Sequence, residues 1–155
     1  MVGSIGARKL NHALNTLFAG EVEFCLDMTR SLLAMVDKDL SGTVDYYEFE
    51  ALVFSLQRWV DVYNRKRDQE TRTLSGYDWQ LGDALRELGY QVPRRLQGLV
   101  VVRYGDDQGN ISLQDFLMAT CRISVMLERF RDRSGMEGEQ ATLLLNDWLQ
   151  DTLYC

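Results

Sequence analysis

Apolar residues recur at steps of three and four along most of this chain, which is the spacing of one face of an α-helix. The clearest examples are the stretches 49–66 and 116–133, where the apolar face runs without interruption. Between them, Gly89 suits the residue just past a helix end, and Pro93 suits the first turn of the next helix. Pro93 is the only proline, so the pattern predicts an all-α fold.

A longer period is superimposed on the helical one. Short polar–apolar–polar segments recur at spacings of 39, 30, 37 and 30 residues. Such self-similarity indicates repeated supersecondary units. A short spacing fits one long helix shared by two units, whereas a long spacing leaves room for two helices and a linker. We therefore predict helix–loop–helix repeats with short paired β-strands between their loops, centred on Ile5, Val44, Leu74, Ile111 and Ala141.

The second unit contains a twelve-residue loop, from Asp37 to Glu48, that is rich in oxygen-bearing side chains. Ca²⁺ takes 6–8 oxygen ligands, and an EF-hand loop supplies them from positions 1, 3, 5, 7, 9 and 12. Gly42 stands at position 6, where the backbone turns too sharply for a side chain. The predicted calcium ligands, with Thr43 contributing its carbonyl, are Asp37, Asp39, Ser41, Thr43, Asp45 and Glu48.

The first and third loops lack essential ligands. The first would begin before Met1 and places Lys9 at position 12, so we expect a first hand truncated at the N-terminus. The third has Arg67 at position 1 and Arg72 at position 6, and its position 12 is the shorter Asp78. Two cations repel a divalent ion, so we expect this loop to stay empty.

The fourth and fifth loops are also incomplete. The fourth keeps Asp106 and Asp115 but has Tyr104 at position 1, which predicts an empty loop, with weak occupancy at high calcium as the alternative. The fifth carries Met136 and Leu145 at ligand positions 3 and 12, so we interpret it as structural.

Composition narrows the function classes. The chain has 155 residues, which suits a single domain over 1–155, and its net charge of −6 argues against nucleic-acid binding. No apolar run reaches the ~18 residues of a membrane span, and no signal peptide opens the chain. Three cysteines without metal-type spacing fit free thiols in a reducing, cytoplasmic setting: Cys25, Cys121 and Cys155.

The residues offer no catalytic machinery. A cysteine protease needs a Cys and a His in contact, but the lone histidine, His12, is expected at the surface. The three cysteines are interpreted as core or terminal thiols. Trp59, Trp79 and Trp148 fall at helical positions and are expected in the core rather than at a cofactor. We predict no enzyme activity for this chain.

The five-unit spacing resembles that of the penta-EF-hand family, and within it the C-terminal domain of a calpain large subunit. The loss of ligands in the third hand departs from conventional calpains and points to an unconventional paralogue. The resemblance covers essentially the whole chain and rests on Met35–Asp39, Glu48–Phe49, Ala84–Tyr90 and Asp147–Cys155.

The resemblance implies a calcium-binding and dimerisation module of an intracellular calpain-type cysteine protease, with the catalytic domain elsewhere. Hands one and two pair, hands three and four pair, and the fifth pairs with a partner's fifth hand, in a homodimer or in a heterodimer with a small subunit. Independently, an odd number of hands leaves one edge unpaired. The predicted interface is the region of Ala141, Leu144 and Trp148, within the apolar set Leu143, Leu144, Leu145, Trp148, Leu149 and Leu153.

Three alternatives stay open at this point. The apolar face of the fifth hand could pack within its own domain. The chain could be a free-standing adaptor of the same family that binds targets with calcium. Calcium itself could either trigger a movement or only stabilise the fold.

Overall fold

The structure is a computed structural model, and it describes residues 3–135 and 138–154. Helices dominate these residues, and the only sheet among them has two short strands, so the predicted all-α, helix–loop–helix fold is confirmed. The elements in chain order are α1 (Ala7–Leu17), α2 (Leu26–Val36), α3 (Tyr46–Lys66), β1 (Leu74–Ser75), α4 (Trp79–Glu87), α5 (Arg94–Tyr104), β2 (Asn110–Ile111), α6 (Leu113–Ser134) and α7 (Leu145–Leu153).

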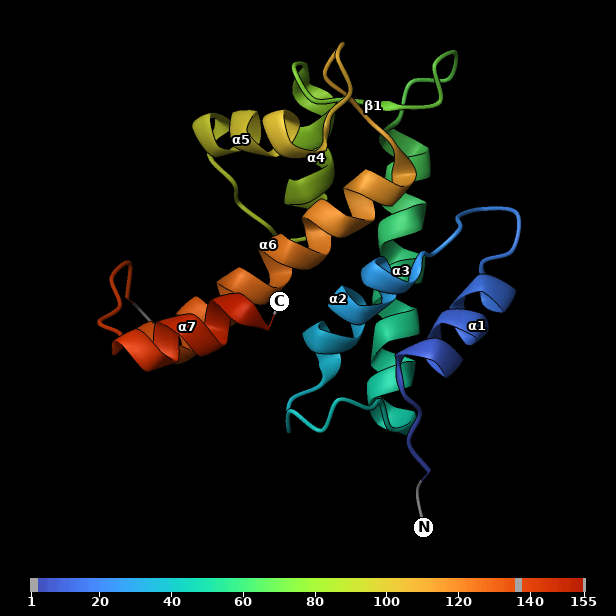
Figure 1. The fold of residues 1–155 in the computed structure, drawn as a ribbon. Coiled ribbons are helices and arrows are strands. Elements are labelled where there is room, and N and C mark those ends of the chain that lie inside the picture. The colour runs from blue at the N-terminus through green and yellow to red at the C-terminus, as the bar shows by residue number, and fades with distance from the viewer. Residues whose placement is uncertain (1–2, 136–137, 155) are drawn as a thin grey trace.

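Two long helices, α3 and α6, form the centre of the molecule (Figure 1). Each contains one of the two stretches predicted from the uninterrupted apolar faces. Their buried faces meet where the ring of Tyr63 packs 5.4 Å from that of Phe116. The buried Tyr63 hydroxyl donates to the carbonyl of Ile111 at 2.8 Å, which satisfies a polar group that would otherwise be costly in the core.

The short strands pair as the repeat predicts. Leu74 lies opposite Ile111 in the antiparallel ladder between β1 and β2. Ile5 and Val44 form an isolated antiparallel bridge, with reciprocal backbone hydrogen bonds of 2.9 and 2.8 Å. Within the described part of the chain, Ala141 belongs to no strand. The loops therefore pair one with two and three with four.

The remaining helices cover the two long ones on different sides. In Figure 1, α1 and α2 lie toward one end and α4 and α5 toward the other. The last helix, α7, runs beside the C-terminal half of α6, and the chain then ends beside the loop that follows α2. Contacts between α2 and α6 connect the first pair of hands to this C-terminal region.

Some expectations about burial were wrong. Trp59 is buried, but Trp79 and Trp148 are 63% and 52% exposed, because each lies in the first turn or two of a helix at the edge of the fold. Cys25 is exposed rather than in the core: it caps α2, and its Sγ accepts a hydrogen bond from the Met28 backbone N–H. Cys121 is buried as expected, His12 is exposed, and Cys155 lies outside the described residues.

None of the helices described combines the length and the apolarity that a membrane crossing requires.

Candidate metal centre

The Asp37–Glu48 loop connects the end of α2 to the beginning of α3. Asp37 is the first residue after α2 and is buried, with 3% of its surface exposed. Gly42 has a φ of 72°, a left-handed conformation that a side chain disfavours, so glycine at loop position 6 is required by the turn. Val44 follows within the bridge to Ile5, and its pairing fixes the second half of the loop.

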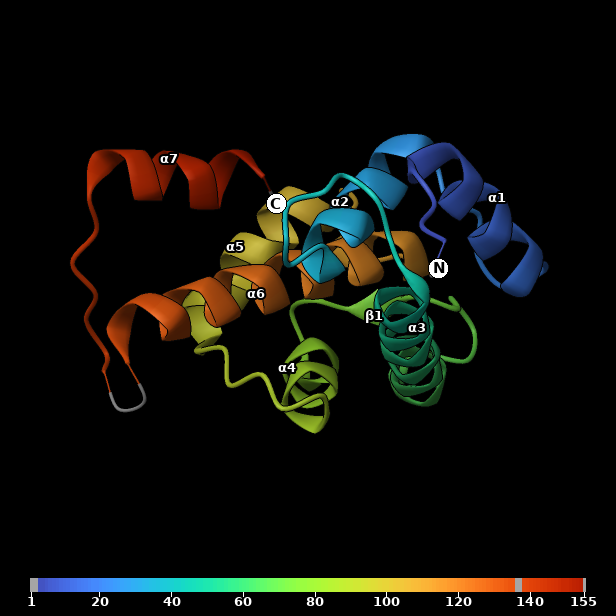
Figure 2. The ribbon, with the colours of Figure 1, turned by 90° about the horizontal axis from the view of Figure 1, so that it is seen from below.

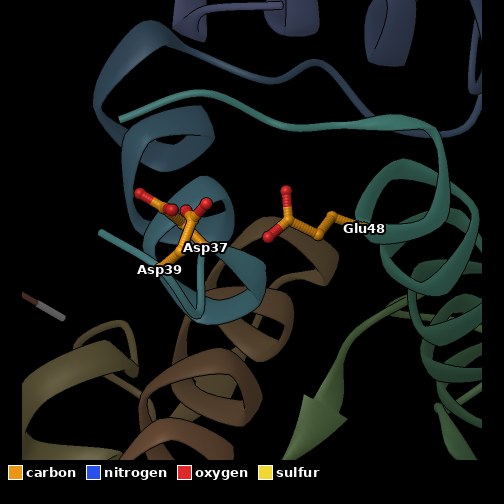
Figure 3. A group of neighbouring side chains, drawn as sticks. All are labelled: Asp37, Asp39 and Glu48. Atoms are coloured by element: carbon orange, nitrogen blue, oxygen red, sulfur yellow. The ribbon is translucent and has the colours of Figure 1, made fainter. Parts of the chain in front are cut away.

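Three carboxylates converge inside this loop. One oxygen each from Asp37, Asp39 and Glu48 lies within 4.8 Å of the other two. Figure 3 shows Asp37 and Asp39 side by side, with Glu48 reaching toward them from the first turn of α3. Like charges this close repel one another unless a cation neutralises them. Among the described residues, this is the only group of three or more His, Cys, Asp or Glu side chains placed to share a metal ion.

Asp37 is the most constrained of the three. Its Oδ1 accepts from the backbone N–H of Ser41 at 2.9 Å, and its Oδ2 accepts from that of Gly42 at 2.8 Å. The Tyr154 hydroxyl donates to the same Oδ2 at 2.5 Å. Burial acts to raise the pKa of Asp37, but the hydrogen bonds from Tyr154, Gly42 and Ser41 outweigh it and hold the pKa below its ordinary value.

Tyr154 shows the reciprocal effect. Burial, together with the hydrogen bond to Asp37, raises the pKa of the Tyr154 phenol to about 12. The phenol is therefore a neutral donor at physiological pH, and Asp37 is an ionised acceptor.

The other predicted ligands lie in the loop but make different contacts. Ser41 Oγ lies 3.2 Å from the Thr43 carbonyl, so both oxygens face the same turn. Asp45 accepts from the Glu48 backbone N–H at 2.9 Å, and Glu48 Oε2 accepts from that of Asp45 at 2.9 Å. This reciprocal pair is a capping box that starts α3. Asp45 is thus outside the three-carboxylate group.

The third and fourth loops use their acids internally. In the third, Asp68 Oδ1 accepts from the backbone N–H groups of Glu70 and Thr71. In the fourth, Asp106 Oδ1 accepts from those of Gln108 and Asn110 at 2.9 and 2.8 Å. Backbone donors lower the pKa of both Asp68 and Asp106. These acids close their own turns, and the occupancy of either loop stays a prediction.

The fifth loop is described only in part, since Met136 falls outside the described residues. Leu145, at its last position, begins α7 and is 71% exposed. The residue at this candidate site that the sequence did not indicate is Tyr154, which donates a hydrogen bond to Asp37. It is 117 positions from Asp37, and no spacing rule connects the two residues.

An exposed apolar face lies on α7. One side of this helix is tied to α6, where Arg133 forms an ion pair with Asp151 at 3.1 Å and Arg129 donates to the carbonyls of Asp151 and Tyr154. A groove of about 180 Å³ between the two helices is lined in part by Met126, Phe130, Leu143 and Trp148. The apolar residues left exposed at α7 are Leu144, Leu145, Trp148, Leu149 and Leu153.

Paired helix–loop–helix units around an acidic twelve-residue loop define an EF-hand protein, and the unit spacing defines the penta-EF-hand arrangement. A solved structure, titled as a homolog of programmed cell death 6 protein from Leishmania major Friedlin, has the same fold, with a TM-score of 0.62 and 21% identity. The likeness covers 98% of this chain and 85% of that one. No protein-family model matches the chain.

Sequence comparison identifies the particular kind of penta-EF-hand chain. Calpain-B of Drosophila melanogaster is 35% identical over 147 residues, covering 95% of this chain. Calpain-A of the same organism is 33% identical over 131 residues, or 84% of this chain. The chain spans 16% of the length of each of these two calpains. Calpain small subunit 2 of Mus musculus is 28% identical over 159 residues, covering 97% of this chain and 62% of that protein.

The chain is a calpain-type penta-EF-hand domain, as its sequence indicates. It is a small regulatory domain and not a protease catalytic domain.

Proposed function

We propose that residues 1–155 form one calcium-binding and dimerisation domain of a calpain-type intracellular cysteine protease. The observation that carries the calcium assignment is the convergence of the Asp37, Asp39 and Glu48 carboxylates within 4.8 Å. Oxygen-only donors of this kind suit a hard cation such as Ca²⁺. The proposed ligands of this single intact site are Asp37, Asp39, Ser41, the Thr43 carbonyl, Asp45 and Glu48.

Bound Ca²⁺ would supply the positive charge that three converging carboxylates lack. The chain's own residues prepare the site. Gly42 and Ser41 orient Asp37 through their backbone N–H groups, and the capping box fixes Glu48 to the first turn of α3. Asp37 follows α2 directly, so the ligand set joins the two helices of the second hand. Ligation at this loop therefore favours one relative placement of α2 and α3.

Dimerisation through the fifth hand is supported by the exposed apolar face of α7. Leu144 and Trp148 are 75% and 52% exposed there, and side chains of this kind are stabilised when a partner covers them. The similarity to calpain small subunits makes a heterodimer with such a subunit a natural arrangement, and an isologous homodimer uses the same face. Ala141, at the centre of the fifth unit, is the proposed strand position for pairing with the partner.

The cytoplasmic, reducing setting is proposed because Cys25, which is exposed on the surface, is a free thiol. Protease activity belongs, in this proposal, to other parts of a longer polypeptide.

Isothermal titration of calcium into protein stripped with a chelator tests the site. We expect one strong site for each chain, with a Kd of ~10⁻⁷–10⁻⁵ M, the range of EF-hand sensors. Asp37→Ala removes the buried ligand at position 1 and should abolish binding. Asp106→Ala, in the fourth loop, is the matched control and should leave the strong site intact. Tight binding that survives Asp37→Ala would refute the assignment.

A further inference from the structure

The last described residue of the chain contacts the candidate calcium loop. The Tyr154 hydroxyl donates to Asp37 Oδ2 at 2.5 Å, although the two residues are 117 positions apart. In Figure 2 the C-terminal end of the ribbon lies beside the loop that follows α2. A residue of the fifth hand thus completes the hydrogen-bond shell of a ligand in the second hand.

The position of Tyr154 is fixed from α6. Arg129 donates to the carbonyls of Asp151 and Tyr154, at the end of α7. Arg133 adds an ion pair to the Asp151 carboxylate at 3.1 Å. Since α6 also contacts α2, the end of α7, α6 and α2 are connected, and this arrangement holds the Tyr154 phenol beside Asp37.

Asp37 is held by donors on both of its oxygens. Gly42 and Tyr154 donate to Oδ2, while Ser41 donates to Oδ1. Donors outside the ligand set orient a metal-binding side chain before the metal arrives, and losing one typically weakens metal affinity by ~10–100-fold. Gly42 and Ser41 act from within the loop, whereas Tyr154 is the donor supplied by a distant element.

We propose that Tyr154 is a positioning residue of the calcium site, through which the end of α7 and the second-hand loop form one coupled unit. This inference rests on the proposed calcium binding at Asp37. Coupling between two sites is reciprocal. Calcium at the second hand therefore stabilises α7 against α6, and an α7 that is held in place strengthens calcium binding.

The test compares calcium titrations of the wild-type chain and of Tyr154→Phe, which removes only the hydroxyl. We expect a Kd about 10-fold weaker for Tyr154→Phe, at the lower end of the effect of losing an outer donor. Tyr77→Phe, at an exposed phenol before α4, is the matched control and should keep the wild-type Kd. A Kd for Tyr154→Phe equal to the wild-type value, or tighter, would overturn the proposal.

Limited proteolysis provides the second measurement. Calcium should slow cleavage within residues 145–153 in the wild-type chain and should do so less in Tyr154→Phe. Equal protection in the two proteins would overturn the coupling. If Tyr154 were only structural, the variant would melt at a lower temperature in chelator with an unchanged calcium Kd, which also refutes the proposal. A wild-type chain that binds no calcium would instead refute the proposed function itself.

Discussion

Replacing Trp148 by alanine should weaken dimerisation strongly. Trp148 is 52% exposed on the apolar face of α7. A tryptophan side chain buries up to ~250 Å² in a complete core, so its exposed half corresponds to roughly 130 Å². At about 25 cal/mol per Å², covering that surface contributes about 3 kcal/mol. This free energy corresponds to a Kd on the order of 100-fold weaker for each Trp148 that is lost from the interface.

Sedimentation velocity over a dilution series measures this Kd, for the chain alone and for the chain mixed with calpain small subunit 2. Trp79→Ala is the matched control, because Trp79 is 63% exposed on α4, away from the fifth hand. We expect wild-type association for Trp79→Ala and mainly monomer for Trp148→Ala. The fifth-hand interface would be refuted if the two substitutions had equal effects. It would also be refuted if the wild-type chain stayed monomeric both alone and mixed with the small subunit.

Three further outcomes follow from other features. Calcium at 1,000 times its Kd should raise the free energy of unfolding by about 4.1 kcal/mol in urea titrations, and no shift would contradict a native-state site. Gly109→Ala should destabilise the fold by more than the roughly 1–2 kcal/mol of its left-handed φ of 76°, because the added Cβ would also clash with the Tyr77 ring. Gly98→Ala within α5, where an added Cβ meets nothing, should stabilise the fold by about 0.5–1 kcal/mol. The same urea assay distinguishes these signs. Hydrogen bonds from Lys66 lower the pKa values of Asp83 and Glu87. The contribution of these two carboxylates to the free energy of unfolding is therefore complete above their ordinary pKa values of 3.8 and 4.5, and it is lost as the pH falls through the lowered pKa values. Lys66→Gln should therefore make the acid-side decline of unfolding free energy shallower, and an unchanged slope would contradict this.

The convergence of carboxylates in the Asp37–Glu48 loop could be predicted because the residues of an EF-hand loop follow a local spacing. Asp37 and Glu48 are eleven positions apart in the sequence, and the turn at Gly42 brings their carboxylates together. The pairing of Leu74 with Ile111 was likewise accessible, because a fixed repeat determines which loops are neighbours. Local rules were sufficient wherever the partners belong to one unit or to adjacent units.

Contacts between distant elements could not be predicted in this way. Nothing in the apolar pattern locates Tyr154 beside Asp37, since that contact depends on how α7 packs along α6. The acids at loop positions 9 and 12 illustrate a second limit. The pair Asp45 and Glu48 fits both an EF-hand loop and a helix capping box, and the structure shows the capping contacts. Exposure of Trp79 was missed because helical periodicity does not say how far a first turn extends beyond its neighbours.

Because of the bridge between Ile5 and Val44, the candidate calcium loop is held in place by a second, distant segment of the chain. Val44 lies between Thr43 and Asp45, so the backbone that presents two proposed ligands is hydrogen-bonded to a segment nearly forty residues earlier in the chain. Separating Ile5 from Val44 would break both of these backbone hydrogen bonds. The half of the loop that contains Thr43 and Asp45 would then be less constrained. A change in the position of the N-terminal segment would thus alter the half of the loop that carries Thr43 and Asp45.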